Sequence, residues 1–147
     1  MIRAAVTEDM PRLLEMGRAF FRESGHEREF EFDPDSFAET LSLLAQHGLL
    51  RVADGPSGPV AMGAIDVARA YWNRKVVLSR EAFWYVDPGH RKGLGRRLLT
   101  DMEAAAGSYG AVIFDVVAEP GPRSAPLEEI YRRAGFNPAE RTFRKRL

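Results

Sequence analysis

VDPGHRKGLGRRLL, residues 86–99, is the stretch of sequence that decides the fold. The residues before it, Glu81–Val86, are mostly apolar or aromatic and predict a strand that ends at Asp87-Pro88-Gly89. Apolar residues then recur at helical spacing and predict a helix from Gly93 to about Ala106. The sequence therefore predicts a strand, a tight glycine-containing loop and a helix in direct succession.

The start of this predicted helix has the features of an anion-binding site. Gly93 and Gly95 leave main-chain N–H groups accessible where a helix has unpaired donors and a partial positive charge. The neighbouring basic residues are His90, Arg91, Lys92, Arg96 and Arg97. A bound pyrophosphate would be held by the backbone and attracted by these cations. The loop matches neither a P-loop nor the three-glycine dinucleotide motif, and a glycine-rich turn with a solvated basic face is the alternative.

The remainder of the chain alternates strand and helix patterns. A strand is predicted at Ile2–Val6, a helix capped by Thr7, and a second helix opened by Asp33-Pro34. Further strands are predicted at 49–53, 60–67 and 112–117, the last as a buried central strand, with a helix that ends at Gly135. Residues 136–147 are predicted to add one or two final strands. This order predicts a mixed α/β fold in one domain, 1–147.

Composition excludes several classes of protein. The chain is 45% hydrophobic and 29% charged, which is typical of a packed globular protein. It contains no cysteine, so disulfides, thiolate metal sites and cysteine nucleophiles are excluded. No run approaches the ~20 apolar residues of a membrane span, and no secretory signal is recognised, so a cytoplasmic protein without membrane association is expected. His26 and His47 lack neighbours at metal-ligand spacing, and no metal site is predicted.

Charge is divided unevenly along the chain. Residues 1–70 contain 12 acidic and 7 basic side chains, whereas residues 71–147 contain 9 acidic and 14 basic ones. The two halves together suggest a site that meets an anion on one side and a cation on the other. Scattered solvated charge is the alternative interpretation.

Three segments in the right order resemble the GCN5-related N-acetyltransferase (GNAT) family. Residues 86–99 resemble its acyl-CoA motif, Arg/Gln-x-x-Gly-x-Gly/Ala, which follows the fourth strand. Residues 2–11 resemble the family's opening strand and helix, and residues 127–136, with Tyr131, Gly135 and Phe136, resemble its Tyr-x-x-x-Gly-Phe segment. The resemblance implies a central mixed sheet, mostly antiparallel, flanked by about four helices.

The resemblance also implies a reaction and its residues. It implies direct attack of a primary amine on acetyl-CoA, with Glu81 as the base and Tyr131 as the acid that protonates the sulfur. The cofactor-binding residues that it implies are Tyr85 and Val86, through main-chain atoms, and His90, Arg91, Lys92, Gly93, Leu94, Gly95, Arg96 and Ser124. The loop is one residue shorter than the family form, so either His90 or Arg91 occupies the Arg/Gln position, with Arg91 favoured for the pyrophosphate. Each of these three assignments has an alternative: Glu81 is a solvated carboxylate at a strand end, Tyr131 is a ring packed on its helix face, and Ser124 is a serine in a turn.

The resemblance implies that the acceptor is an amine of a small molecule or peptide. Acidic residues gather in Glu23–Asp35, which in this family borders the acceptor, so a cationic amine is expected; a solvated acidic loop is the alternative. Tyr71, Trp72 and Trp84 are candidates for an acceptor pocket, although core packing is their commoner role.

Two other functions remain as alternatives. One is a non-catalytic acyl-CoA-binding regulatory module. The other is nucleic-acid binding by the basic tail, which the acidic first half argues against. Pairing of C-terminal strands would allow a homodimer.

Overall fold

The computed structural model describes residues 1–147 and contains two compact units, Met1–Asp115 and Val116–Leu147. That the whole chain forms one domain stays a prediction.

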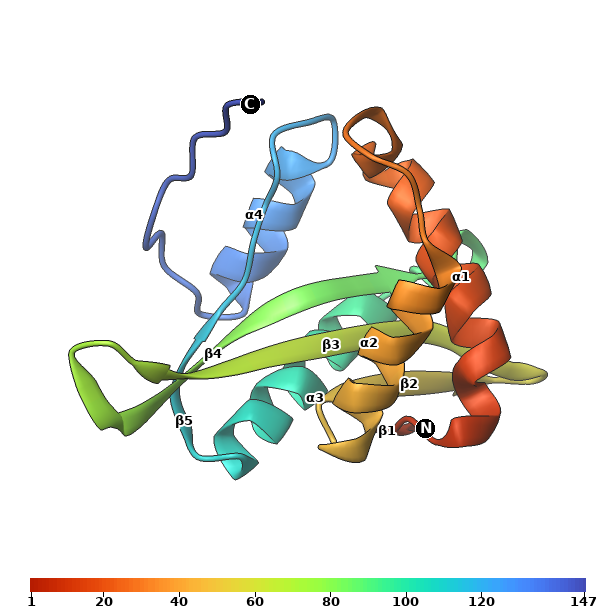
Figure 1. Ribbon diagram of the computed structural model, residues 1–147, viewed down its shortest axis with the longest axis horizontal. Coiled ribbons are helices and arrows are strands. Elements are labelled where there is room, and N and C mark those ends of the chain that lie inside the picture. The colour runs from red at the N-terminus through yellow and green to blue at the C-terminus, as the bar shows by residue number, and fades with distance from the viewer. The chain divides into compact units, whose positions relative to one another are not determined.

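The larger unit is built on one five-stranded sheet (Figure 1). The strands are β1 (Ile2–Ala4), β2 (Leu50–Gly55), β3 (Gly58–Ala70), β4 (Asn73–Val86) and β5 (Ala111–Asp115). They lie in the order β1-β2-β3-β4-β5, with antiparallel pairing up to β4 and parallel pairing between β4 and β5. The prediction of a mixed, mostly antiparallel sheet is confirmed.

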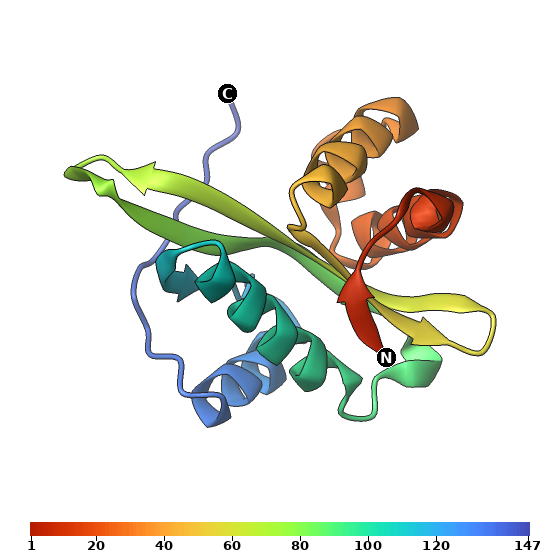
Figure 2. The ribbon, with the colours of Figure 1, turned by 90° about the horizontal axis from the view of Figure 1, so that it is seen from below.

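Helices cover both faces of this sheet (Figure 2). α1 (Met10–Glu23) and α2 (Pro34–Gln46) lie on one face, and α3 (Leu94–Ser108) lies on the other. α2 begins where predicted, because the Asp33 carboxylate accepts hydrogen bonds from the N–H groups of Asp35 and Ser36. The predicted cap at Thr7 is wrong. Thr7 opens a short 3₁₀ turn, and Asp9 instead accepts the Val6 N–H.

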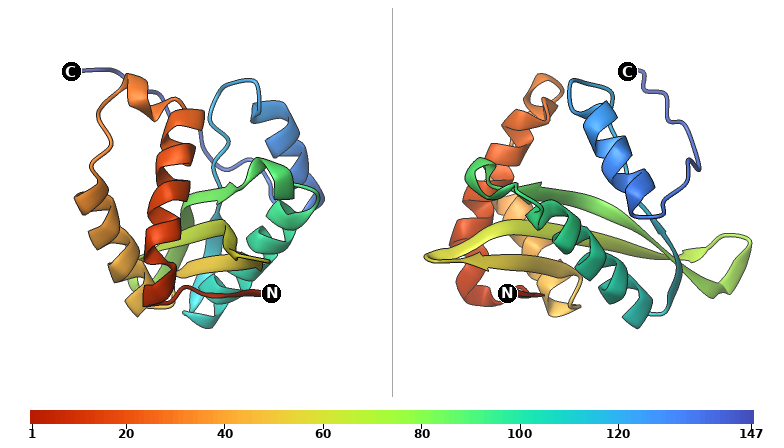
Figure 3. Two further views of the ribbon diagram at one scale, coloured as in Figure 1. Left: turned by 90° about the vertical axis from the view of Figure 1, so that its right-hand side faces the viewer. Right: turned by 180° about the vertical axis from the view of Figure 1, so that it is seen from behind.

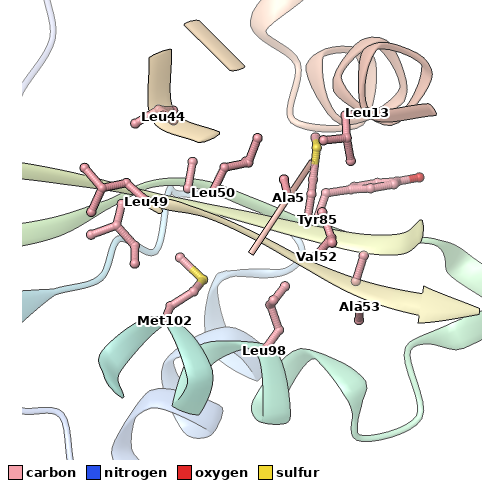
Figure 4. Packing of buried hydrophobic residues seen from close by; sticks show 14 of the residues in the cluster. Ala5, Leu13, Leu44, Leu49, Leu50, Val52, Ala53, Tyr85, Leu98 and Met102 are labelled. Carbon is pink, nitrogen blue, oxygen red and sulfur yellow. The ribbon is translucent and has the colours of Figure 1, made fainter. Parts of the chain in front are cut away.

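The core lies between the sheet and these helices (Figure 4). Leu13 of α1 contacts it from one side, whereas Leu98 and Met102 of α3 contact it from the other, and all three are fully buried. Each such side chain contributes roughly 1.5–3 kcal/mol of burial free energy. Gly63 of β3 allows α3 to approach closely, since a Cβ there would lie 2.3 Å from the Met102 Sδ.

Three predictions about the strands need correction. β4 begins at Asn73 rather than Glu81, because it forms a long hairpin with β3 whose tip projects from the sheet (Figure 3). Tyr71 and Trp72 lie at this tip with exposed fractions of 87% and 96%, so core packing is wrong for both. β5 is an edge strand rather than a central one, and Val112 on it is exposed.

The smaller unit contains α4 (Ser124–Arg133). This helix ends at Gly135 as predicted, where φ is +92°. The final strands predicted in residues 136–147 are absent. Pro138 lacks an N–H and interrupts any ladder at that point, and Phe143 and Leu147 are exposed, so the segment has no buried apolar face to stabilise a strand. A homodimer stays a prediction without support from C-terminal strands.

Arg3 joins the first strand to two acidic partners. Its guanidinium contacts Asp9 at 2.7 Å and Asp54 at 2.7 Å, which connects β1, the start of α1 and the end of β2. Asp9 is only 6% exposed. Hydrogen bonds from Arg3 hold the pKa of Asp9 below its ordinary value, despite the opposing effect of burial.

This lowered pKa makes stability depend on pH. Asp9 stabilises the fold above its unfolded pKa of about 3.9, and this contribution is lost as pH falls through the lower folded pKa. We expect Asp9→Asn to lower the free energy of unfolding by about 3 kcal/mol at pH 7 and by less at pH 3. Urea titrations at both pH values would measure this, with Asp35→Asn, at an exposed carboxylate, as the control. Equal losses at both pH values would contradict it.

Candidate active site

The sheet opens between β4 and β5 at one defined position. Parallel pairing runs from Val77↔Ala111 to Arg80↔Asp115 and ends there. β4 continues for six more residues, Glu81–Val86, which pair only with β3 in the described ladder. One edge of β4 is therefore not covered by β5 from Glu81 onward.

Glu81 is the first residue after this parallel pairing ends. A bulge at Ala82 changes the alternation of side chains, because Glu81 pairs with Ile65 whereas Phe83 pairs with the adjacent Ala64. Phe83 faces α2, where its ring centroid lies 5.5 Å from that of Phe37, so Glu81 points to the opposite face. Its Oε2 atom is shielded from solvent.

The end of β4 turns main-chain groups toward the uncovered edge. The Asp87 N–H donates to the Val60 carbonyl at 2.9 Å. This hydrogen bond determines which residues of β4 direct their main-chain groups toward β3. By alternation, the N–H and C=O of Val86 point away from β3, as do those of Trp84. The main-chain groups of Tyr85 point toward β3. The sequence analysis named Tyr85 beside Val86 for main-chain binding of the cofactor, but Trp84 is the second residue whose main-chain groups face this edge. Only the strand register, which the sequence does not reveal, shows the difference.

The loop after β4 presents the N-terminus of α3. Gly93 caps this helix with φ of +80°, a conformation that favours glycine, and a Cβ there would meet open space. The first helical hydrogen bond runs from the Arg97 N–H to the Gly93 carbonyl. The N–H groups from Gly93 to Arg96 therefore have no carbonyl partner within the helix. The side chains of His90, Lys92 and Arg96 are exposed beside these donors.

Gly95 holds the helix start against β4. A Cβ at Gly95 would lie 2.8 Å from Cζ3 of Trp84 and 3.8 Å from a methyl group of Val86. Only a residue without a side chain therefore lets the first turn of α3 pack on the end of the strand. This contact brings the donors of α3 next to the uncovered edge of β4.

Two ion pairs fix the loop to α1. Arg91 contacts the Glu23 carboxylate at 2.7 Å and donates from Nε to the Val86 carbonyl at 3.0 Å. Arg12 pairs with Asp87 at the other end of the loop and donates to the Pro59 carbonyl. Arg91, favoured by the sequence for the pyrophosphate, thus has two partners within the protein.

Comparison with solved structures identifies this architecture. A GCN5-related N-acetyltransferase from Ralstonia eutropha JMP134 superimposes with a TM-score of 0.72 at 21% identity, covering 99% of this chain and 97% of that one. A predicted acetyltransferase from Clostridium acetobutylicum, solved with acetyl-CoA, gives a TM-score of 0.75 at 16% identity, with 99% and 95% covered. The chain has the GNAT fold. An aminoglycoside antibiotic 6′-N-acetyltransferase from Acinetobacter haemolyticus shares this fold at a TM-score of 0.69 and 17% identity, covering 100% and 99%.

No protein-family model and no curated protein matches the sequence of this GNAT-fold chain. The similarity therefore establishes the architecture alone. The structure contains no cluster of three or more His, Cys, Asp or Glu side chains suited to a metal ion. None of its helices combines the length and the apolar character required to cross a bilayer.

Tyr131 and Ser124 belong to the smaller unit of this GNAT fold. Tyr131 is 6% exposed, and its hydroxyl donates to the Val117 carbonyl at 2.9 Å. The Ser124 hydroxyl donates to Glu128 on the same helix at 3.1 Å. Their positions relative to Glu81 and the loop stay a prediction.

One further feature of the GNAT-fold chain was missed by the sequence analysis. A cavity of about 450 Å³ lies between α1, α2 and the β4 bulge, and aromatic rings form most of its lining. His26, which the sequence analysis weighed only as a metal ligand, lines it and stacks on Phe30. The available signal was Phe30-Glu31-Phe32, two large apolar residues in an otherwise polar connection.

Proposed function

We propose that this chain is an acyl-CoA-dependent N-acetyltransferase. The observation that carries the proposal is the junction of the uncovered β4 edge with the glycine-containing start of α3. Main-chain donors for a diphosphate and for an extended acyl-pantetheine chain then lie along one continuous path. Val86 lies five positions after Glu81, and five steps of about 3.3 Å span roughly 16 Å, enough for an extended arm to run beside the strand.

The residues present fit the diphosphate of coenzyme A. The N–H groups of Gly93, Leu94, Gly95 and Arg96 can donate to its oxygens, and the space around Gly93 leaves them accessible. His90, Lys92 and Arg96 supply cationic or donor side chains at the same place. Arg91 already pairs with Glu23 and Val86, so we assign it to fixing the loop, with a shift toward the diphosphate as the alternative.

The chemistry requires a neutral amine and a fixed carbonyl. Acetyl-CoA supplies the thioester, and the Val86 N–H is directed to stabilise the oxyanion that forms on its carbonyl oxygen. An alkylamine with a pKa of about 10.4 is neutral in only about one molecule in a thousand near pH 7.4, which costs about 4 kcal/mol. Glu81 takes this proton in our proposal, directly or through water. Tyr131 protonates the departing thiolate. This step needs less catalytic help than deprotonation of the amine, because a thiolate whose thiol has a pKa near 8.5 is a fair leaving group.

Two measurements on the intact protein test the proposal. Calorimetry should detect binding of coenzyme A and acetyl-CoA, and a panel of primary amines should accelerate thiol release from acetyl-CoA. Absence of coenzyme A binding even at millimolar ligand would overturn the assignment. Binding without thiol release across apolar, aromatic and cationic amines would favour the non-catalytic regulatory module.

A further inference from the structure

We infer that the cavity between α1, α2 and β4 binds a primary amine that carries an aromatic ring. This inference rests on the proposed function and specifies the class of acceptor. It depends on how this chain distributes its phenylalanines, on the connection of the cavity to β4, and on the charge at its rim.

Six of the nine phenylalanines of the chain line this one cavity. They are Phe20, Phe21, Phe30, Phe32, Phe37 and Phe83. None of the six is buried, and Phe30 is 63% exposed, whereas the buried core of this unit consists of aliphatic side chains, methionines and Tyr85. Phe20, Phe37 and Phe83 pack against the core on one side, whereas Phe21, Phe30 and Phe32 lie outside the core cluster. This concentration of partly exposed aromatic surface indicates a binding site.

The rings form a continuous wall from the outer connection down to the sheet. Neighbouring centroids are 5.4 Å apart for Phe21–Phe30 and Phe21–Phe32, and 5.5 Å apart for Phe32–Phe37 and Phe37–Phe83. The tilted and edge-on angles leave ring faces and edges that suit another aromatic ring. α1 and α2, which carry part of this wall, cover the same face of the sheet (Figure 3).

The floor of the cavity is formed by Ala82 and Phe83 at the β4 bulge. Ala82 is adjacent to Glu81, where pairing with β5 ends. Glu81 points to the opposite face, so a ligand whose ring occupies the aromatic wall must extend its aminoalkyl chain past the Ala82 bulge, along the uncovered edge of β4, to reach it. The volume of about 450 Å³ is ample for a small arylalkylamine.

The rim carries negative charge that favours an ammonium group and disfavours a carboxylate. Glu31 and Asp33 line the cavity and are exposed. Hydrogen bonds from Ser36 and from the Asp35 N–H hold the pKa of Asp33 below its ordinary value, so Asp33 is charged at neutral pH. The Arg18 guanidinium already lies 5.3 Å from the Phe32 ring centroid, which shows that this wall accepts a cation.

The test compares matched amines at saturating acetyl-CoA. We expect kcat/KM for phenethylamine to exceed that for ethanolamine by about 100-fold and that for cyclohexylethylamine by several-fold, because the ring adds apolar contact and aromatic pairing. Phenylalaninamide should react better than phenylalanine, whose carboxylate faces the acidic rim. Equal or better turnover of ethanolamine or spermidine would overturn the inference while leaving the proposed function intact.

Variants separate the cavity from general effects. Phe30→Ala should reduce the preference for phenethylamine over ethanolamine about tenfold, whereas Phe143→Ala, at another exposed phenylalanine outside the cavity lining, should leave it unchanged. Binding of para-fluorophenethylamine, followed by fluorine NMR without acetyl-CoA, provides a readout that needs no turnover. Binding that Phe30→Ala weakens, in a protein that takes up no coenzyme A, would support the ligand class and overturn the proposed function. No binding of the fluorinated amine, with or without coenzyme A, would overturn the inference.

Discussion

Glu81→Gln should lower the rate of acetyl transfer to an alkylamine by about 100-fold at pH 7. Glu81 lies where the β5 pairing ends, and its carboxylate is the candidate acceptor for the proton of the ammonium group. The amide of glutamine retains the size of the side chain and cannot take that proton. The loss should be largest for strongly basic amines, because nearly all molecules of such an amine are protonated at this pH.

The dependence on the amine distinguishes a base from a structural residue. A fluorinated alkylamine that is already neutral at pH 7.4 should react with Glu81→Gln at nearly the parent rate, whereas its unfluorinated counterpart should not. Steady-state kinetics with both amines would measure this, and Glu103→Gln, at an exposed carboxylate on α3, is the control. The same loss for both amines would remove Glu81 from proton transfer.

The strand, loop and helix of the site could be predicted because their signals are local. Pro88 and Gly89 end the strand, and Gly93 permits the left-handed turn that starts α3. The start of α2 was equally predictable, because the Asp33 side chain caps the helix. In each case the residues that determine the structure are adjacent in sequence.

The parts that were wrong or missed depend on partners distant in sequence. The β3–β4 hairpin extends past the core with Arg74 and Lys75 exposed, so no apolar periodicity marks its outer half. An apolar run such as residues 112–117 does not distinguish an edge strand from a central one. The bulge at Ala82, which sets the directions of Glu81 and Phe83, arises from pairing with β3 and leaves no signal in the sequence.

The aromatic cavity was only partly predictable from the sequence. Its rings come from α1, the connection between α1 and α2, α2 and β4, and only the fold brings Phe83 of β4 beside Phe37 of α2. The phenylalanines at 30 and 32 were nevertheless visible as apolar residues in a segment read mainly for its acidic charge. Charge and aromatic residues in one connection together indicate an amine site more specifically than either does alone.

Gly95→Val should raise the dissociation constant of coenzyme A about 30-fold. The added side chain would meet the Trp84 ring, since even a Cβ lies 2.8 Å from Cζ3, and the first turn of α3 must then move away from β4. Loss of one charge-assisted hydrogen bond to the diphosphate costs about 2 kcal/mol, which corresponds to this factor. Calorimetric titration with coenzyme A would measure the change.

Gly107→Val provides a matched control within the same helix. A Cβ at Gly107 meets no heavy atom within 4 Å, so this substitution changes helix propensity without a collision. Adding Trp84→Leu to Gly95→Val should recover part of the affinity, because it removes the ring that forces the helix away. If Gly95→Val binds coenzyme A as tightly as Gly107→Val, the close approach of α3 to β4 does not position the donors, and the diphosphate must be held by side chains of the loop instead.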